Sequence, residues 1–206
     1  AAPGDTILVS SGSYNESLVV DKSLVLRGID TGGGQPQVQS DEEPAIILLA
    51  KGVTIEGFAI KSQSNKRESA GILIQSNDNL IMDNLVHGCG NAGVVLSQAI
   101  NNTILSNLIE GNGNEGMYLK NSSRNRLEGN QIRDNRYGLR LEDSHTNKIV
   151  GNLLQNNEFE AMYLEASHSN LIEGNLVEDN EMGLVMEKSR SNLVYKNDIQ
   201  GNEKGI

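Results

Sequence analysis

Apolar residues recur along the C-terminal two thirds of the chain in short patterns that alternate inward and outward. One column of such residues comprises Ile81, Ile104, Leu127, Ile149, Ile172 and Val194. Five residues later a second column comprises Val86, Ile109, Ile132, Leu154, Val177 and Ile199. The third element of each unit is an apolar pair around one outward residue: Val94 and Leu96, Met117 and Leu119, Leu139 and Leu141, Met162 and Leu164, Leu184 and Met186. A period of two indicates β-strands, and no segment keeps a helical period over three turns.

Asparagines repeat with the same spacing of 22 or 23 residues. One column opens the units at Asn79, Asn102, Asn125, Asn147, Asn170 and Asn192. A second follows at Asn84, Asn107, Asn130, Asn152, Asn175 and Asn197, and a third at Asn112, Asn135, Asn157, Asn180 and Asn202, with Cys89 in the same slot of the first unit. Stacked strands lie about 4.8 Å apart, so equivalent amides in neighbouring units are expected to hydrogen-bond instead of being buried unpaired.

The repeat therefore predicts an all-β fold, a right-handed parallel β-helix. It is a single-stranded solenoid with three short strands per coil and 22–23 residues per coil. A leucine-rich repeat has a similar period, but its pattern would require leucines where Ser122 and Asn125 stand, and no helical half follows. A glycine precedes the third strand of most units, where we expect a positive φ: Gly93, Gly116, Gly138, Gly183 and Gly205.

The regularity divides the chain into two parts of one continuous domain. Residues 79–206 carry the regular repeats, whereas residues 1–78 are expected to form irregular coils of the same helix. Strand-like runs in this first part lie at 6–9, 17–20, 24–26, 46–49, 53–55 and 71–74. The segment 30–44, rich in Gly, Gln and acidic residues, is predicted to be a loop that leaves the coil. Because no end cap is evident in the sequence, we expect a fragment of a longer protein.

Composition and charge exclude several classes of protein. The net charge of −10 and the absence of Lys/Arg clusters argue against nucleic acid as a partner. No apolar run is long enough to span a membrane. The single cysteine, Cys89, excludes an internal disulfide. Aromatic residues make up only 3% of the chain, which suits a core one side chain deep.

Both parts of the chain resemble one known family. Its opening coils are similar in sequence to Pro3-Gly4-Asp5-Thr6-Ile7, Gly12-Ser13-Tyr14-Asn15-Glu16 and Asp21-Lys22-Ser23-Leu24-x-Leu26-x-Gly28. Together with the Asn-x-Ile-x-x-Asn repeats, these motifs resemble the NosD-type β-helix proteins, also described as CASH (carbohydrate-binding and sugar-hydrolase) domains, of the pectin-lyase-like superfamily. The resemblance implies right-handed coiling, an extracellular, cell-surface or periplasmic location, and acidic polysaccharide or envelope glycan as partner.

The outward residues of the third strands are the best candidates for a carbohydrate-binding site. Tyr118, Arg140 and Tyr163 stack in consecutive coils, so that two aromatic rings about 10 Å apart flank a guanidinium that suits a uronate or a sulfate. Beside them runs a column of charged residues: Lys120, Glu142, Glu165 and Glu187. The alternative is a solvated face on which Arg140 pairs with the glutamates. Stacked glutamates also leave Ca²⁺ open as a ligand, although no cofactor is predicted.

Two further features are weaker candidates. His145 and His168 occupy the same slot of adjacent coils and could ligate a metal, although no metal site is predicted. An outward column of leucines, Leu85, Leu108, Leu153 and Leu176, is more apolar than a free face and could contact an adjacent domain of the same polypeptide or another subunit.

Three functions fit this sequence. The first is a non-catalytic β-helix module of a cell-surface or secreted protein that binds polysaccharide or acts as a structural spacer. The alternative is the scaffold of a polysaccharide-degrading enzyme (lyase, hydrolase or epimerase) whose catalytic residues lie outside this chain. A third, implied by the resemblance, is a NosD-like periplasmic accessory protein for a copper enzyme. The sequence favours the first, because no catalytic acid–base pair is recognisable in it.

Overall fold

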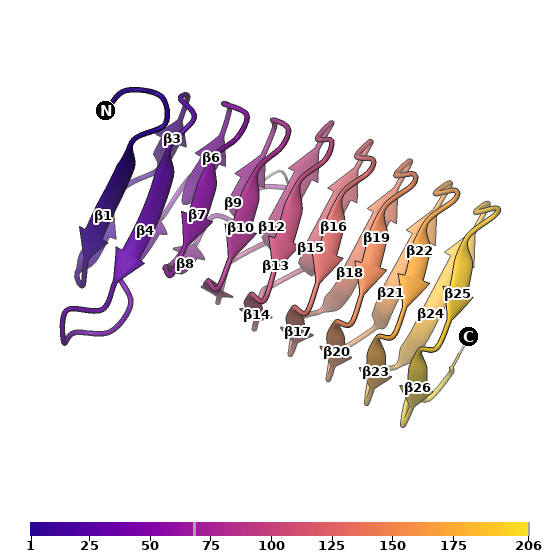
Figure 1. Cartoon of the computed structure of the whole chain (residues 1–206). Helices are drawn as coiled ribbons and strands as arrows, with labels where there is room; N and C mark the ends of the chain where they lie inside the picture. The colour runs from indigo at the N-terminus through magenta and orange to yellow at the C-terminus, as the bar shows by residue number, and fades with distance from the viewer. Residues whose placement is uncertain (68, 206) are drawn as a thin grey trace.

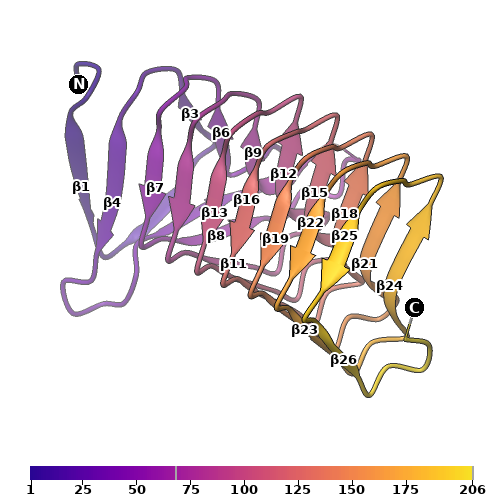
Figure 2. The ribbon, with the colours of Figure 1, turned by 45° about the vertical axis from the view of Figure 1, so that its right-hand side comes forward.

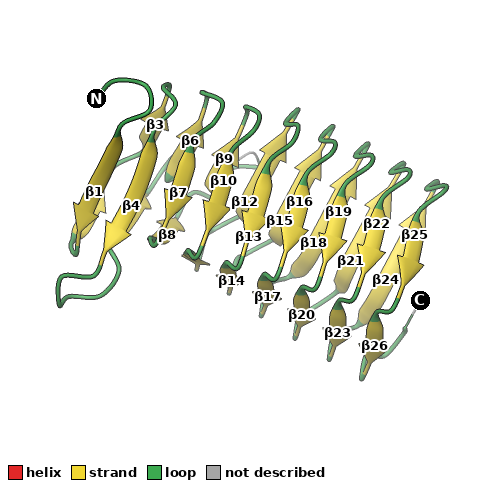
Figure 3. Cartoon of the chain, viewed as in Figure 1, coloured by secondary structure: helices red, strands yellow, loops and turns green. Residues whose placement is uncertain are grey.

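Each repeat unit of the sequence forms one turn of a coil, and the coils stack into a rod (Figure 1). The computed structural model describes residues 1–67 and 69–205. These residues form 26 strands and contain no helix, and therefore no helix that could cross a membrane (Figure 3). The two termini lie at opposite ends of the rod (Figures 1 and 2).

The strands form three parallel sheets that run along the rod. Sheet A contains the first strand of each coil: β1 (Thr6–Ser10), β4 (Val25–Ile29), β7 (Thr54–Glu56), β10 (Leu80–Met82), β13 (Thr103–Leu105), β16 (Arg126–Glu128), β19 (Lys148–Val150), β22 (Leu171–Glu173) and β25 (Leu193–Tyr195). Sheet B contains the second: β2 (Ser13–Asn15), β5 (Gln37–Ser40), β8 (Ala59–Ser62), β11 (Leu85–His87), β14 (Leu108–Glu110), β17 (Gln131–Arg133), β20 (Leu153–Gln155), β23 (Leu176–Glu178) and β26 (Asp198–Gln200). Sheet C contains the third: β3 (Leu18–Val20), β6 (Ile46–Leu48), β9 (Ala70–Ile74), β12 (Ala92–Ser97), β15 (Glu115–Lys120), β18 (Tyr137–Glu142), β21 (Glu160–Glu165) and β24 (Met182–Glu187).

The register of the sheets is the one that the repeat predicts. Ile81 pairs with Ile104 in sheet A, and Ile104 pairs with Leu127 in the next coil. The middle residue of nearly every regular strand of sheets A and B is buried while its two neighbours are partly or fully exposed. The core is therefore a continuous column of Ile, Leu, Val and Met side chains inside the coil. The predicted fold class, an all-β right-handed parallel β-helix with three strands per coil, is confirmed.

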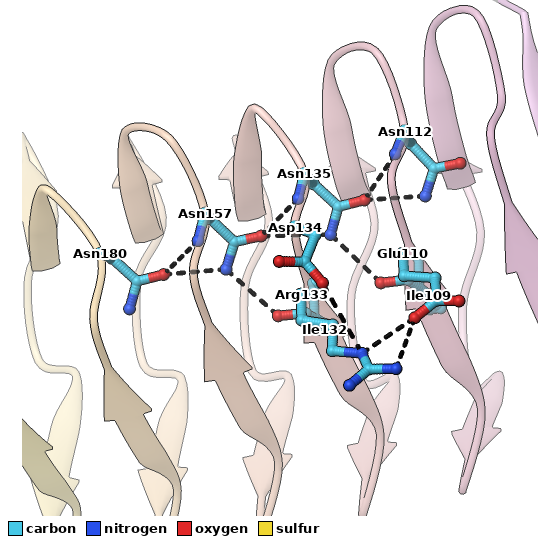
Figure 4. Close-up of polar contacts among 9 residues, drawn as sticks. All are labelled: Ile109, Glu110, Asn112, Ile132, Arg133, Asp134, Asn135, Asn157 and Asn180. Carbon is cyan, nitrogen blue, oxygen red and sulfur yellow. Dashed lines mark hydrogen bonds and ion pairs between the residues drawn. The ribbon is translucent and has the colours of Figure 1, made fainter.

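The asparagine columns are buried hydrogen-bond ladders, as predicted. Figure 4 shows the third column, in which each side-chain oxygen accepts two hydrogen bonds from the asparagine of the preceding coil. In the second column, Asn130 accepts from the backbone N–H and the Nδ2 of Asn107, both at 3.0 Å. Its own Nδ2 donates to the carbonyl of Ile104 at 2.9 Å and to Asn152 at 3.0 Å. One side chain thus links three coils.

The glycines that were expected before the third strands are, except for Gly205, the second residues of these strands, and their role differs from the one expected. Gly93, Gly116, Gly138 and Gly183 do not have positive φ. A Cβ atom at Gly138 would lie 2.3 Å from the carbonyl oxygen of Ala161 in the next coil, so close backbone approach favours glycine here, although Ala161 holds the equivalent position of β21. Left-handed residues occur instead at the bends, directly before ladder asparagines: Ser106, Gly129, Gly151 and Gly174.

The N-terminal coils follow the same three-sheet plan. The predicted strand-like runs all contain strands, whereas β2, β5 and β8 of sheet B were not anticipated. The loop predicted over residues 30–44 is only partly correct, because β5 lies inside it and pairs in parallel with β2 and β8. The segment between β4 and β5 does leave the coil (Figure 2). There Asp30 accepts the backbone N–H groups of Gly32 and Gly34.

Asn130→Ala should destabilise the rod, since it leaves several buried polar groups of neighbouring coils without partners. We expect a loss of roughly 3 kcal/mol in the free energy of unfolding, measured by urea denaturation. Gln131→Ala, at the exposed adjacent position, is the matched control and should change it by less than about 0.5 kcal/mol. Equal effects of the two substitutions would contradict a stabilising role of the ladder.

Candidate functional site

The outer face of sheet C brings together the residues that the sequence analysis selected. Tyr118, Arg140 and Tyr163 lie directly opposite one another in β15, β18 and β21. The Arg140 guanidinium carbon lies 5.6 Å from the centre of the Tyr118 ring and 5.4 Å from that of Tyr163. The cation is therefore sandwiched between two aromatic rings, in the range of cation–π attraction.

Carboxylates surround this cation and neutralise it. Arg140 Nη2 lies 3.2 Å from Glu165 and 3.6 Å from Glu142, and Nη1 lies 4.0 Å from Glu115. The Tyr118 hydroxyl donates a hydrogen bond to Glu142. Arg140 thus separates glutamates that would otherwise repel one another in the stack. Its Nε is buried and has no hydrogen-bond partner among the described residues.

The ionisation of the two tyrosines is shifted by this environment. Burial, followed by the hydrogen bond to Glu142, raises the pKa of Tyr118. Partial burial and the carboxylates of Glu187 and Glu165 raise the pKa of Tyr163 to about 12. Both phenols therefore stay protonated near neutral pH and act as hydrogen-bond donors.

Glu115 belongs to this face and was missed in the sequence analysis. It is the first residue of β15 and only 6% exposed. Burial raises its pKa above the ordinary 4.5, and Arg140 opposes this only in part. The equivalent residues of the neighbouring coils are Ala92 and Tyr137, so no column pattern marks the position.

A second aromatic cluster on sheet C was also missed. The rings of Tyr137 and Phe159 stack with their centres 5.2 Å apart, and the Arg136 guanidinium carbon lies 5.6 Å and 5.3 Å from them. The whole chain has only five Tyr and two Phe. Four of these seven residues lie on strands β15, β18 and β21 or directly beside them. The repeat itself does not require aromatic residues to gather on these three strands.

A pocket of about 340 Å³ adjoins Tyr118 on the side of the N-terminal coils. Its apolar lining includes Leu73 and Val95 of β9 and β12, and Arg67 lines it from the segment before β9. Lys120, the last residue of β15, also lines it. Among the predicted site residues, Tyr118, Lys120, Arg140 and Glu142 border this pocket, whereas Tyr163, Glu165 and Glu187 continue along the face away from it.

The other candidates lie elsewhere on the rod. The imidazoles of His145 and His168 stack with their centres 5.1 Å apart. Their Nδ1 atoms accept the backbone N–H groups of His168 and Arg190 in the next coil, so both serve the stacking of coils. The leucines are half-buried in sheet B as two separate pairs, Leu85 with Leu108 and Leu153 with Leu176, since Gln131 interrupts the column.

Glu115 should make the free energy of unfolding decrease as pH rises, whereas a carboxylate with a lowered pKa would make it increase. Its raised pKa means that the folded state holds the proton more tightly, so its contribution to the free energy of unfolding falls as pH rises from about 4.5 through the folded pKa. Glu115→Gln removes this titration. Urea unfolding between about pH 4 and pH 7 should show the wild type losing stability relative to Glu115→Gln.

The exposed Glu158 provides a matched control, as Glu158→Gln removes a carboxylate without changing the buried site. A stability difference between wild type and Glu115→Gln that is flat with pH, or that grows in favour of the wild type, would contradict the assignment.

Solved structures with the same architecture include two epimerases and a phage tailspike. A double mutant of the periplasmic alginate epimerase AlgG has a TM-score of 0.75 at 18% identity, covering 94% of this chain and 50% of AlgG. The mannuronan C-5 epimerase AlgE6 A-module of Azotobacter vinelandii has a TM-score of 0.73 at 14% sequence identity, and the match covers 98% of this chain and 69% of the module. The enzymatically active domain of bacteriophage CBA120 tailspike protein 2 has a TM-score of 0.68 at 11% sequence identity, and the match covers 92% of this chain and 38% of the tailspike chain.

At these identities the likeness establishes the fold alone, and the chain spans only half the length of AlgG. No curated protein matches the sequence significantly. A family model described as "Periplasmic copper-binding protein (NosD)" matches residues 34–206, which include all the regular coils. Since this match covers most of the chain, and the repeat and the fold agree with it, the protein belongs to the NosD family of parallel β-helix proteins.

Proposed function

We propose that this chain is a non-catalytic β-helix module that binds polysaccharide along the outer face of sheet C, in the periplasm or outside the cell. The observation that carries this proposal is the gathering of Tyr118, Tyr163, Tyr137 and Phe159 on one face of a chain that is poor in aromatic residues. Aromatic rings supply apolar area against which the C–H faces of sugar rings can pack.

The spacing of the coils suits an extended sugar chain. Neighbouring strands are about 4.8 Å apart, so residues two coils apart, such as Tyr118 and Tyr163, are separated by about 10 Å. This is about the length of two pyranose units laid along the rod. The charged column beside the rings, with Lys120, Glu142, Glu165 and Glu187, would meet the hydroxyl and ionised groups of the same chain.

The comparisons support this class of ligand. The structures with the same fold are named as epimerases of alginate and mannuronan and as a phage tailspike, and AlgG and the NosD family are described as periplasmic. An acidic polysaccharide or an envelope glycan is therefore the partner that we propose, and a periplasmic or extracellular location follows from it.

Binding is better supported than catalysis within this chain. A tyrosine that acts as a base needs a lowered pKa, whereas burial raises that of Tyr118. An arginine that neutralises a substrate carboxylate needs to be free, whereas Arg140 is already shared by three glutamates. The role of an enzyme scaffold, with catalytic residues outside this chain, is compatible with the same fold, but no feature of the face favours it.

Copper, which the family description names, is not matched by the described residues. Among them no three His, Cys, Asp or Glu side chains come together in a cluster that could hold a metal ion. His145 and His168 use their Nδ1 atoms on the backbone of the next coil. Cys89 is buried in the core, where burial raises its pKa to about 11 and disfavours the thiolate that would bind a metal. The proposal therefore assigns no role to copper.

Tyr163→Ala should weaken retention of the 206-residue chain on immobilised acidic polysaccharide by roughly threefold to tenfold, because one stacking surface is lost. Phe159→Ala should have a similar effect. Affinity electrophoresis in gels that contain alginate or polygalacturonate would measure both.

Tyr195→Ala, which removes a tyrosine from sheet A, is the matched control and should leave retention unchanged. Retention that is equal for wild type, Tyr163→Ala and Phe159→Ala would exclude the face of sheet C as the binding surface.

A further inference from the structure

The pocket beside Tyr118 has features that a flat binding face lacks. It lies over β9, β12, β15 and β18, and Leu73 and Val95 occupy the outward positions that Tyr118 and Arg140 hold in the next two coils. Its volume of about 340 Å³ lies within the range of small-molecule sites. Arg140 also lines the pocket, and Tyr163 follows Arg140 on the next strand of the face.

Its floor is apolar and well packed. Val95 is 7% exposed and packs with Ala70 and Ala92 in a small cluster on the outer side of sheet C, separate from the core inside the coil. Leu73 and the ring of Tyr118 contact this cluster. A flat apolar floor with one aromatic wall is the surface that the C–H face of a single sugar ring would cover.

The rim offers uncommitted polar groups. Gln75, Gln98 and Asn121 line the pocket and are exposed. Their backbone N–H groups hold the coils together by donating to the carbonyls of Leu48, Lys120 and Glu142. Their side-chain amides form no hydrogen bond with the residues that the structure describes, and each amide has both a donor and an acceptor, which suits sugar hydroxyls.

The pocket lining contains two cations besides Arg140, namely Lys120 and Arg67. Glu142, which lies opposite Lys120 in the register, is held by the Tyr118 hydroxyl and by Arg140. Glu115 also faces Arg140, with its carboxylate 4.0 Å from Nη1. Lys120 forms no ion pair with the part of the chain that the structure describes, and Arg67 adds a second positive charge to the lining.

We propose that this pocket is a subsite for one carboxylate-bearing sugar ring, a uronate, whose carboxylate is bound by Lys120. The inference rests on the proposed polysaccharide-binding function and deepens it. It moves the anion contact from Arg140, which the sequence analysis selected, to Lys120, because Arg140 already has three carboxylate partners. The remainder of the aromatic face then binds neighbouring sugar units without recognising their charge.

The test is an NMR titration of the ¹⁵N-labelled 206-residue chain with glucuronate and, separately, with glucose. We expect glucuronate to shift the side-chain amide signals of Gln75, Gln98 and Asn121 and to bind at least about tenfold more tightly than glucose. Lys120→Gln should reduce this preference about tenfold. Val95→Phe, which fills the floor, should abolish binding of both sugars.

Two controls separate the subsite from general effects. Lys148→Gln removes an exposed lysine from sheet A and should leave the preference unchanged. Thermal unfolding identifies a Val95→Phe variant that fails to fold, in which case Lys120→Gln still decides the matter. Equal binding of glucuronate and glucose, or a preference that survives Lys120→Gln, would overturn the proposal.

Failure of this inference can be distinguished from failure of the proposed function. If neither monosaccharide binds while Tyr163 remains necessary for retention on acidic polysaccharide, the subsite is wrong and the binding face stands. If retention on polysaccharide is also independent of Tyr163 and Phe159, both proposals are wrong.

Discussion

The parallel hydrogen bonding between consecutive coils is the constraint on which the rest of this structure depends. Every strand pairs with the strand one turn earlier and one turn later, except at the two ends of each sheet. At the bends, this backbone pairing is interrupted, and buried backbone groups would be left without hydrogen-bond partners. The asparagine side chains supply these partners, because each donates and accepts hydrogen bonds across the boundary between two coils. A buried polar network of this kind is stable only when complete, which explains why the column tolerates so few other residues.

This constraint divides the residues of each coil into two classes. Inward residues, ladder asparagines and the glycines pressed against the next backbone have almost no freedom, since each must match its counterparts above and below. Outward residues of the strands have no such restriction and differ from coil to coil. Chemistry that is specific to this protein is therefore found on the outward positions, and on sheet C these carry most of its aromatic rings.

On the outer face of sheet C, the stacking that aligns equivalent side chains also brings like charges close together. Glutamates at equivalent positions of β18, β21 and β24 would repel one another, and the guanidinium of Arg140 relieves part of this repulsion. Arg140 consequently has a structural task that reduces its value as a ligand contact. Lys120 lies one strand earlier in the same column, opposite Glu142, and forms no ion pair with the described residues. The difference in ion pairing between Arg140 and Lys120 thus follows from their positions in the stack more than from their residue types.

The fold class, the number of strands per coil, the register and the asparagine ladders were all predictable from the sequence, because each follows from a period that more than five units repeat. The stacked group of Tyr118, Arg140 and Tyr163 was predictable for the same reason. Only the tertiary structure revealed Glu115, the Tyr137–Phe159 pair and the pocket over Leu73 and Val95, and it showed that Arg140 pairs with the glutamates, an alternative that the sequence had left open. These features depend on side chains of neighbouring coils meeting across a face, and on residues such as Arg67 from outside the repeat, so no period in the sequence records them. The sequence by itself determined which residues stack, whereas the distances and burial within the folded chain decided which of their charged groups pair with one another.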